Sequence, residues 1–167
     1  IKTDNIFVEK DQSGEWHFDF ADFAFAEDSS GLRLVLAGTH EYMSWKDRSQ
    51  FDIEGRDRFR YLEIKQKQDV FATGLCMAFL ILGKKRCLKR LLAIQELLSK
   101  RELSKMQPED SHLEEEHQEL FEKVEGRLAA KLQENLPMLQ AIVSMIQVDS
   151  NQRPSINVIH WRHPHFF

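Results

Sequence analysis

The feature that most constrains this chain is an apolar run at residues 68–82, QDVFATGLCMAFLIL. Its apolar side chains recur on nearly every face of a helix, so no polar stripe is left to face water. The run is interrupted by Thr73 and Gly74 and is too short to cross a bilayer. We therefore predict a helix at the centre of a helical core, and we expect residues 70–82 to be its most buried part.

More helices are expected after this run. The apolar spacing predicts amphipathic helices at about 88–102, 111–133 and 136–148, with Pro137 in the first turn of the last of these. A final short helix is expected to follow the loop at 151–155. The acidic run at 114–116 has the pattern of a solvated helix face.

Short strands are expected before the apolar run. Residues 5–8 and 16–20 surround a polar turn that contains Gly14, which predicts a hairpin. Residues 32–36 predict one further strand. The apolar residues of 37–65 show no clean period, so we expect an ordered loop region there. The alternating aromatic residues of 16–25 are expected to pack into the core rather than stack on bases. The predicted fold class is mainly α with a small β-hairpin.

The composition excludes several classes of protein. The 167 residues carry a formal net charge of -4 with the charges interspersed, so we expect no nucleic-acid partner. No leader or membrane span is apparent, so we expect no membrane partner. Cys76 and Cys87 cannot form a disulfide framework and lack metal-ligand spacing. We expect a soluble protein that is cytoplasmic or otherwise intracellular.

Residues 1–8, IKTDNIFV, resemble the part of the protein kinase catalytic loop that follows its aspartate. Residues 20–24, FADFA, are similar to the Asp-Phe-Gly element, with alanine in place of glycine. The resemblance implies that Asn5 and Asp22 bind Mg²⁺, that both belong with Lys2 to an ATP site, and that Lys2 stabilises the transferred phosphate. The alternatives are a turn residue for Asp22 and a solvated side chain for Lys2.

Residues 38–44, GTHEYMS, resemble the end of the activation segment of serine/threonine kinases, which implies a catalytic role for Thr39. In the family, the next three residues are Ala-Pro-Glu. Here residues 44–46 replace them, so that Lys46 stands at the position of the glutamate. Arg153 stands at the position of the arginine with which this glutamate usually pairs. Because Lys46 facing Arg153 would be unfavourable, we expect a local rearrangement or another acid, such as Asp47, in this role.

Two further motifs follow in the family's order. Residues 68–74 resemble the start of the family's central helix, in which the aspartate at position 69 accepts hydrogens from catalytic-loop backbone. Because the catalytic-loop residues before Ile1 are not among the 167, we expect the Asp69 carboxylate either to have an incomplete set of donors or to turn toward the amino terminus. Residues 153–155 and 163–167 match the Arg-Pro-Ser and His-Pro-x-Phe pair that closes many kinase domains. This match explains two of the three late histidines, at 160, 163 and 165, without a zinc ion.

The resemblance identifies residues 1–167 as a partial protein kinase domain, the C-terminal lobe. Its parts are a catalytic-loop remnant and hairpin at 1–36, an activation-segment end at 37–46 and a helical body at 66–167. The seven glycines nowhere form a Gly-x-Gly-x-x-Gly loop, and no strand lysine or catalytic aspartate is recognisable. We therefore expect the chain as given to be inactive by itself.

Two functions remain open at this point. The complete domain would transfer the γ-phosphoryl of ATP, with Mg²⁺, to serine or threonine hydroxyls of a protein substrate. Alternatively, the lobe is a pseudokinase or scaffold that binds a regulatory protein. Ala24 and the sequence at 44–46 favour the second function, whereas Lys2, Asn5 and Asp22 favour the first. Ser29, Ser30 and Thr39 are candidate phosphorylation sites in either case.

Overall fold

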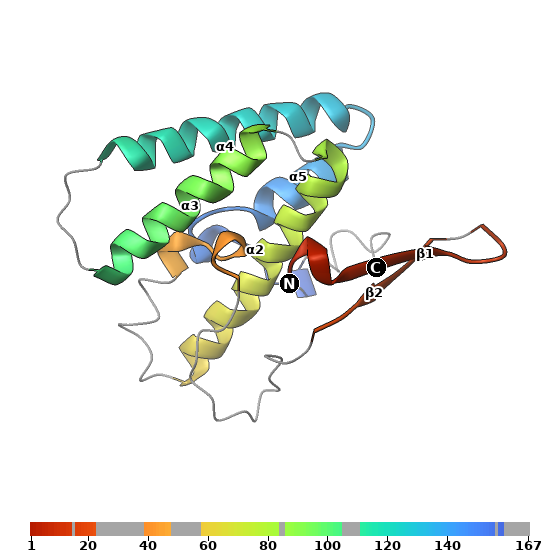
Figure 1. Cartoon of the computed structure of the whole chain (residues 1–167), viewed down its shortest axis with the longest axis horizontal. Helices are drawn as coiled ribbons and strands as arrows, with labels where there is room; N and C mark the ends of the chain where they lie inside the picture. Colours follow the sequence, from red (N-terminus) through yellow and green to blue (C-terminus); the bar gives the residue numbers. More distant parts are fainter. Residues whose placement is uncertain are drawn as a thin grey trace.

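A computed structural model describes residues 1–14, 16–22, 39–47, 58–83, 86–104, 111–155 and 157–158. Within them a two-stranded antiparallel sheet and a helical body follow one another along the chain (Figure 1), which confirms the predicted mainly α class with a small hairpin. The elements are η1 (Thr3–Asn5), β1 (Ile6–Lys10), β2 (Trp16–Phe20), η2 (His40–Tyr42), α2 (Arg58–Leu82), α3 (Arg86–Ser104), α4 (Ser111–Lys131), α5 (Leu136–Met145) and η3 (Ser150–Gln152).

Helix α2 is the central element of the core, as the apolar run predicts. It packs against α5, α4 and η2, and most of its positions from 70 to 82 are buried, with Leu80 as the exposed exception. The helix begins at Arg58, so the expectation of a loop region up to residue 65 is wrong for its last part. Tyr61 and Ile64 are buried one turn apart, and this weak apolar stripe among charged residues extends the helix.

The other helices lie close to their expected bounds. Helix α4 buries Leu120, Val124 and Leu128, while Glu114 and Glu115 of its acidic run are exposed as expected. The side chain of Asn135 caps α5 by accepting the Met138 backbone N–H at 3.1 Å. In the part of the chain that the structure describes, no helix is long and apolar enough to span a membrane.

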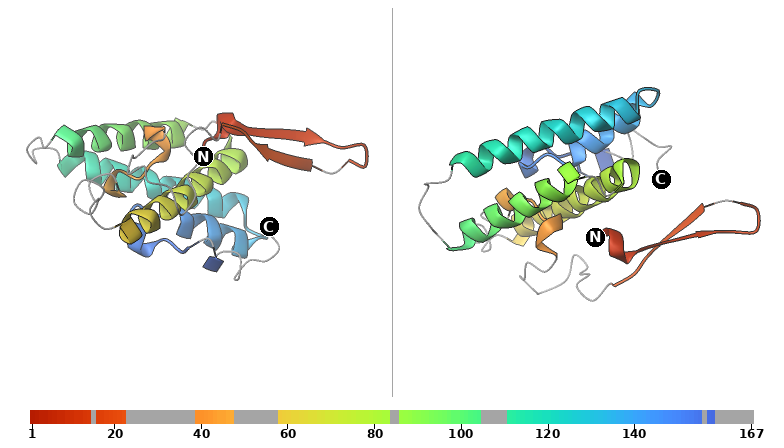
Figure 2. Two further views of the ribbon diagram at one scale, coloured as in Figure 1. Left: turned by 90° about the horizontal axis from the view of Figure 1, so that it is seen from below. Right: turned by 45° about the horizontal axis from the view of Figure 1, so that its top comes forward.

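The predicted hairpin is confirmed, with register from Ile6↔Phe20 to Lys10↔Trp16. Figure 2 shows it projecting away from the helices. The expectation that its aromatic face packs into the core is wrong for Phe20, which is 50% exposed, because the ribbon extends away from the described helices. Three predictions concern residues that lie mostly or wholly outside the described part of the chain. They are the strand at 32–36, the packing of the aromatic residues at 23 and 25, and the short helix up to residue 163.

Helices α2 and α5 approach most closely at Gly74. A Cβ atom added there would lie 2.7 Å from Met145 Cβ and 2.8 Å from Ile146 Cγ2, which is closer than non-bonded carbon atoms can pack. Glycine therefore sets the distance between these two helices, at the usual cost of glycine in a helix.

Gly74→Ala should lower the free energy of unfolding by about 1–2 kcal/mol, because overpacking outweighs the gain in helix propensity. The matched control is Gly126→Ala in α4, where an added Cβ meets no atom within 4 Å. This control should instead stabilise the protein by up to about 1 kcal/mol. Urea unfolding of both variants measures the difference, and a stabilised Gly74→Ala would contradict the close approach.

Candidate functional site

The hairpin brings Asn5 and Asp22 together at its base. Asn5 ends η1 immediately before β1, and Asp22 follows the end of β2, so antiparallel pairing makes them neighbours. The Ala21 N–H donates to the Asn5 carbonyl at 2.9 Å, and Asn5 Nδ2 donates to Asp22 Oδ2 at 3.3 Å. The predicted proximity of these two side chains, 17 positions apart in sequence, is confirmed.

The backbone of Asp22 adopts a left-handed conformation, with φ of +62°. Among the described residues it is the only non-glycine residue with a positive φ, and aspartate tolerates this region better than most residues. The conformation turns the chain sharply after β2. The exposed carboxylate consequently reaches back to Asn5.

The other two predicted site residues are placed differently. Lys2 precedes η1 in the same turn as Asn5, and its carbonyl accepts the Asn5 N–H at 3.1 Å. Thr39 is exposed, and its carbonyl accepts the Tyr42 N–H at 2.9 Å, which begins η2. Within the described residues the Thr39 side chain makes no contact with Asn5 or Asp22.

A hydroxyl pair that the sequence did not predict joins this site to η2. Thr3 Oγ1 and Tyr42 Oη lie 2.8 Å apart, although the residues are 39 positions apart in sequence. Burial raises the pKa of the Tyr42 hydroxyl above its ordinary value, and the hydrogen bond with Thr3 opposes this. Tyr42 thus stays protonated at neutral pH and holds the turn at residues 3–5 against the helical body.

The Asn5–Asp22 pair offers one amide oxygen and one carboxylate to a hard cation. In its present orientation the Asn5 amide donates its N–H to the carboxylate, so a rotation of the amide would be needed to present its oxygen. In the described part of the chain no group of three or more His, Cys, Asp or Glu residues could hold a metal ion. Two oxygen ligands fit Mg²⁺ only where water and substrate phosphates complete its shell.

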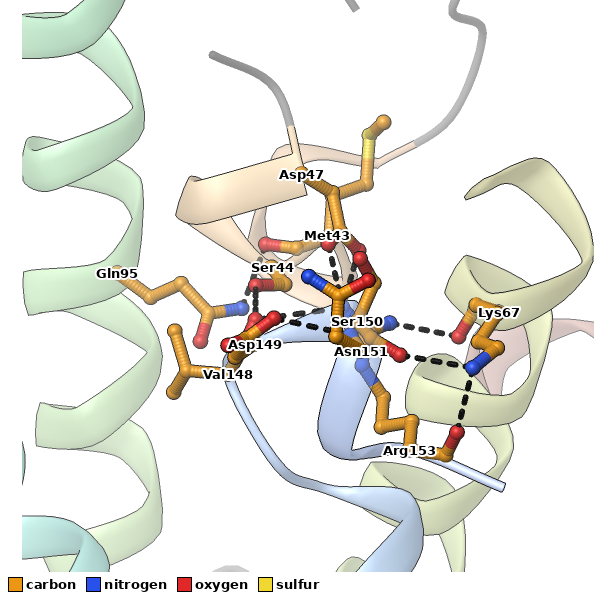
Figure 3. Close-up of polar contacts among 10 residues, drawn as sticks. All are labelled: Met43, Ser44, Asp47, Lys67, Gln95, Val148, Asp149, Ser150, Asn151 and Arg153. Carbon is orange, nitrogen blue, oxygen red and sulfur yellow. Dashed lines mark hydrogen bonds and ion pairs between the residues drawn. The ribbon is translucent and has the colours of Figure 1, made fainter. Parts of the chain in front are cut away.

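A second polar centre is buried between α2 and the segment that follows α5 (Figure 3). Arg153 Nη2 contacts both carboxylate oxygens of Asp47 at 2.5 Å, and both side chains are fully buried. This pair confirms the expectation that Arg153 meets an acid other than a residue at position 46, namely Asp47. Lys46 does not face Arg153, because it is exposed and its Nζ lies 5.4 Å from the centroid of the Trp45 ring.

Backbone carbonyls complete this centre. Arg153 Nη1 donates to the Lys67 carbonyl at 2.6 Å, and Lys67 Nζ donates back to the Arg153 carbonyl at 2.7 Å and to the Ser150 carbonyl at 3.0 Å. Ser44 Oγ donates to the Val148 carbonyl at 2.5 Å. The contacts bind residues 44–47, α2 and the segment after α5 to one another.

Burial raises the pKa of Asp47, and the charge of Arg153 and the hydrogen bonds from Arg153 and Ser150 oppose this effect. Taking both charges out of water is costly, so the value of the pair lies in its geometry more than in net stability. The Arg153 guanidinium also lies over Phe71, 5.2 Å from the ring centroid, which gives the cation a further favourable contact.

Gln95 holds the opposite side of the segment at 40–47. Its Nε2 donates to the carbonyls of Met43 at 2.7 Å and Glu41 at 3.1 Å. Its Oε1 lies 3.5 Å from Nε2 of His117, a buried residue of α4. Burial lowers the pKa of His117 from its ordinary value of 6.5 to about 4, with the charge of Lys46 acting in the same direction.

Asp69 of α2 is exposed, and the positive charge of the Ile1 amino group acts on its carboxyl group. This interaction agrees with the second of the two expected outcomes, in which the carboxylate turns toward the amino terminus. Desolvation raises the pKa of this carboxyl group, while the positive charges of the Ile1 amino group and of Lys65 oppose the shift.

Comparison with known proteins adds no family assignment. No family model, curated protein sequence or solved structure is similar enough to this chain to count as a match.

Asp47→Asn should lower the free energy of unfolding by about 3–5 kcal/mol, because it leaves the Arg153 charge buried without a counter-charge. The double variant Asp47→Leu/Arg153→Met should be more stable than Asp47→Asn, because it removes both desolvated charges. The control is Glu116→Gln, which breaks an exposed pair with Arg90 at 2.9 Å and should cost less than about 1 kcal/mol. Urea unfolding compares all three; equal losses for Asp47→Asn and Glu116→Gln would contradict the burial of the pair.

His117 should make the protein less stable as the pH falls from 7 to 5. Its folded pKa of about 4 lies below the ordinary value of 6.5, so the unfolded state binds a proton in this interval and the folded state does not. The loss due to this residue should be about 2 kcal/mol. His117→Gln keeps a polar side chain without titrating, and urea unfolding at both pH values should show a smaller loss for this variant. An unchanged pH dependence would mean that His117 titrates freely in the folded state.

Proposed function

We propose that this chain is the C-terminal lobe of a protein kinase-like domain that, in its complete form, transfers the γ-phosphoryl of ATP to serine or threonine hydroxyls. The observation that carries the proposal is the contact of 3.3 Å between Asn5 Nδ2 and Asp22 Oδ2. The resemblance requires these two side chains to meet, and they do so at the base of the hairpin, one before β1 and one after β2.

The residues present fit a magnesium ion that is shared with a nucleotide. Asn5 and Asp22 would hold the ion by their side-chain oxygens, and Lys2, in the same turn as Asn5, would contact the transferred phosphate. Bound Mg²⁺ would supply charge neutralisation on the phosphates. Thr39 would act at the site of the protein substrate, a role that rests on the resemblance alone.

The anchoring of residues 40–47 supports the same proposal. In the family that the chain resembles, an acid–arginine pair secures the end of the activation segment. Here Asp47 and Arg153 form such a pair, and Gln95 binds the carbonyls of Glu41 and Met43. The segment that would present a protein substrate is thereby held against α2 and α3. Intracellular location belongs to the same proposal, since ATP is an intracellular phosphoryl donor and Cys76 and Cys87 are free thiols.

The second candidate function is a pseudokinase or scaffold lobe that binds a regulatory protein. Ser44 and Trp45, which replace the family's alanine and proline, are buried, so this stretch contributes packing as well as anchorage. Under this function Asn5 and Asp22 would be structural residues of the hairpin base.

A titration with Mn²⁺, a paramagnetic ion that accepts the same oxygen ligands as Mg²⁺, separates the two functions. At about millimolar Mn²⁺, the NMR signals of the Asn5 side-chain amide and of the Asp22 backbone should broaden first. Asp22→Asn should abolish this selective broadening. The control Glu9→Gln removes an exposed carboxylate of β1 and should leave the broadening unchanged.

Isothermal titration with Mg²⁺-ATP should show no binding by this chain at about tens of micromolar, because most phosphate-binding groups of the family are not among its residues. Broadening that persists in Asp22→Asn would reject the metal role and favour the scaffold. Saturable micromolar binding of Mg²⁺-ATP that Asp22→Ala abolishes would instead show that this lobe binds the nucleotide unaided.

A further inference from the structure

In the part of the chain that the structure describes, the hairpin has an exposed apolar face and a strand edge without a partner strand. Val8 and Phe20 lie on the same face by the register of the sheet, and they are 46% and 50% exposed. Figure 2 shows the hairpin extending away from the described helices. A two-stranded ribbon is at best marginally stable in water, and additional strands stabilise it.

The backbone of β2 determines which groups its outer edge offers. Ala21 N–H donates to the Asn5 carbonyl, so residues 5 and 21 form a hydrogen-bonded pair. Hydrogen-bonded and non-hydrogen-bonded pairs alternate in antiparallel sheets, so residues 17 and 19 also turn their backbone groups toward β1. Positions 16, 18 and 20 therefore turn their N–H and C=O groups outward. Among the described residues no strand pairs with this edge.

The sequence of β2, Trp-His-Phe-Asp-Phe at 16–20, is complementary to itself when two copies run antiparallel about position 18. Residue 18 of one copy then faces residue 18 of the other, and the aromatic residue at 16 of each copy faces the aromatic residue at 20 of the other. His17 of each copy faces Asp19 of the other. The His17/Asp19 pairs occur twice and fall at non-hydrogen-bonded positions, where opposing side chains lie closest. An ion pair or a hydrogen bond between imidazole and carboxylate can thus form in both pairs.

This edge also lacks the devices that keep strands apart. Edge strands are commonly protected by lysine, proline or bulges. Strand β2 contains none of these residues, and Asp19 is its only carboxylate, whereas β1 carries Glu9 and Lys10 in its last two positions. The edge of β2 is therefore a better place for another strand than the edge of β1.

We infer that two copies of this chain associate by antiparallel pairing of their β2 strands about a two-fold axis at position 18. The two-stranded sheets join into one sheet of order β1-β2-β2-β1. The six outward N–H and C=O groups at positions 16, 18 and 20 of each copy find partners, and the apolar faces become continuous. His17 keeps its contact with Asp11, 2.9 Å from its Nε2, and turns Nδ1 toward Asp19 of the second copy.

Sedimentation velocity of the full chain from about 1 to 300 μM measures this association through the dissociation constant of the dimer. His17→Asp should raise that constant at least about tenfold, because two attractive pairs become carboxylate–carboxylate pairs. The double variant His17→Asp/Asp19→His exchanges the charges and should restore the constant to within about threefold of the unmodified chain. Glu9→Gln on β1 is the control and should change it by less than about twofold.

The double variant also controls for an effect on folding, because it and His17→Asp place the same new carboxylate beside Asp11. Circular dichroism shows whether the helical body stays folded in both variants. A chain that stays monomeric over the whole range overturns the inference. So does a dimer that His17→Asp leaves unchanged, or one that the charge exchange fails to restore. The Mn²⁺ titration depends on Asp22, which lies outside the paired strands, so its result is independent of this one.

Discussion

The buried ion pair of Asp47 and Arg153 is the interaction on which the arrangement of the helical body depends. It joins two residues that are 106 positions apart, and Arg153 also binds the carbonyls of Lys67 and Val148. The pair therefore specifies one geometry for residues 40–47 against α2, at a considerable cost in desolvation.

The same segment links the two polar centres of the molecule. At one end Asp47 is held by Arg153, and at the other Tyr42 contacts Thr3 beside the Asn5–Asp22 pair. Gln95 fixes the carbonyls between them. A set of polar contacts thus runs from the buried core to the base of the hairpin, where the candidate metal ligands lie.

The hairpin and the helical body are stabilised by different means. Helix α2 packs against α4 and α5, and most of its apolar residues belong to one buried cluster. In the hairpin, by contrast, Phe7, Val8 and Phe20 are exposed. The candidate site for a cation, the left-handed Asp22 and the open edge of β2 all belong to this less protected part, which is where binding to other molecules costs the least rearrangement.

The sequence by itself determined the central helix and the hairpin, because each follows from local periodicity or from two strands joined by a short turn. The resemblance added the expectations that Asn5 meets Asp22 and that Arg153 pairs with an acid. The start of α2 at Arg58 and the exposure of Phe20 depended on which surfaces other elements cover. The contacts of Tyr42 with Thr3 and of Gln95 with Met43 were decided only by the tertiary structure, because these residues are 39 and 52 positions apart and no local pattern pairs them.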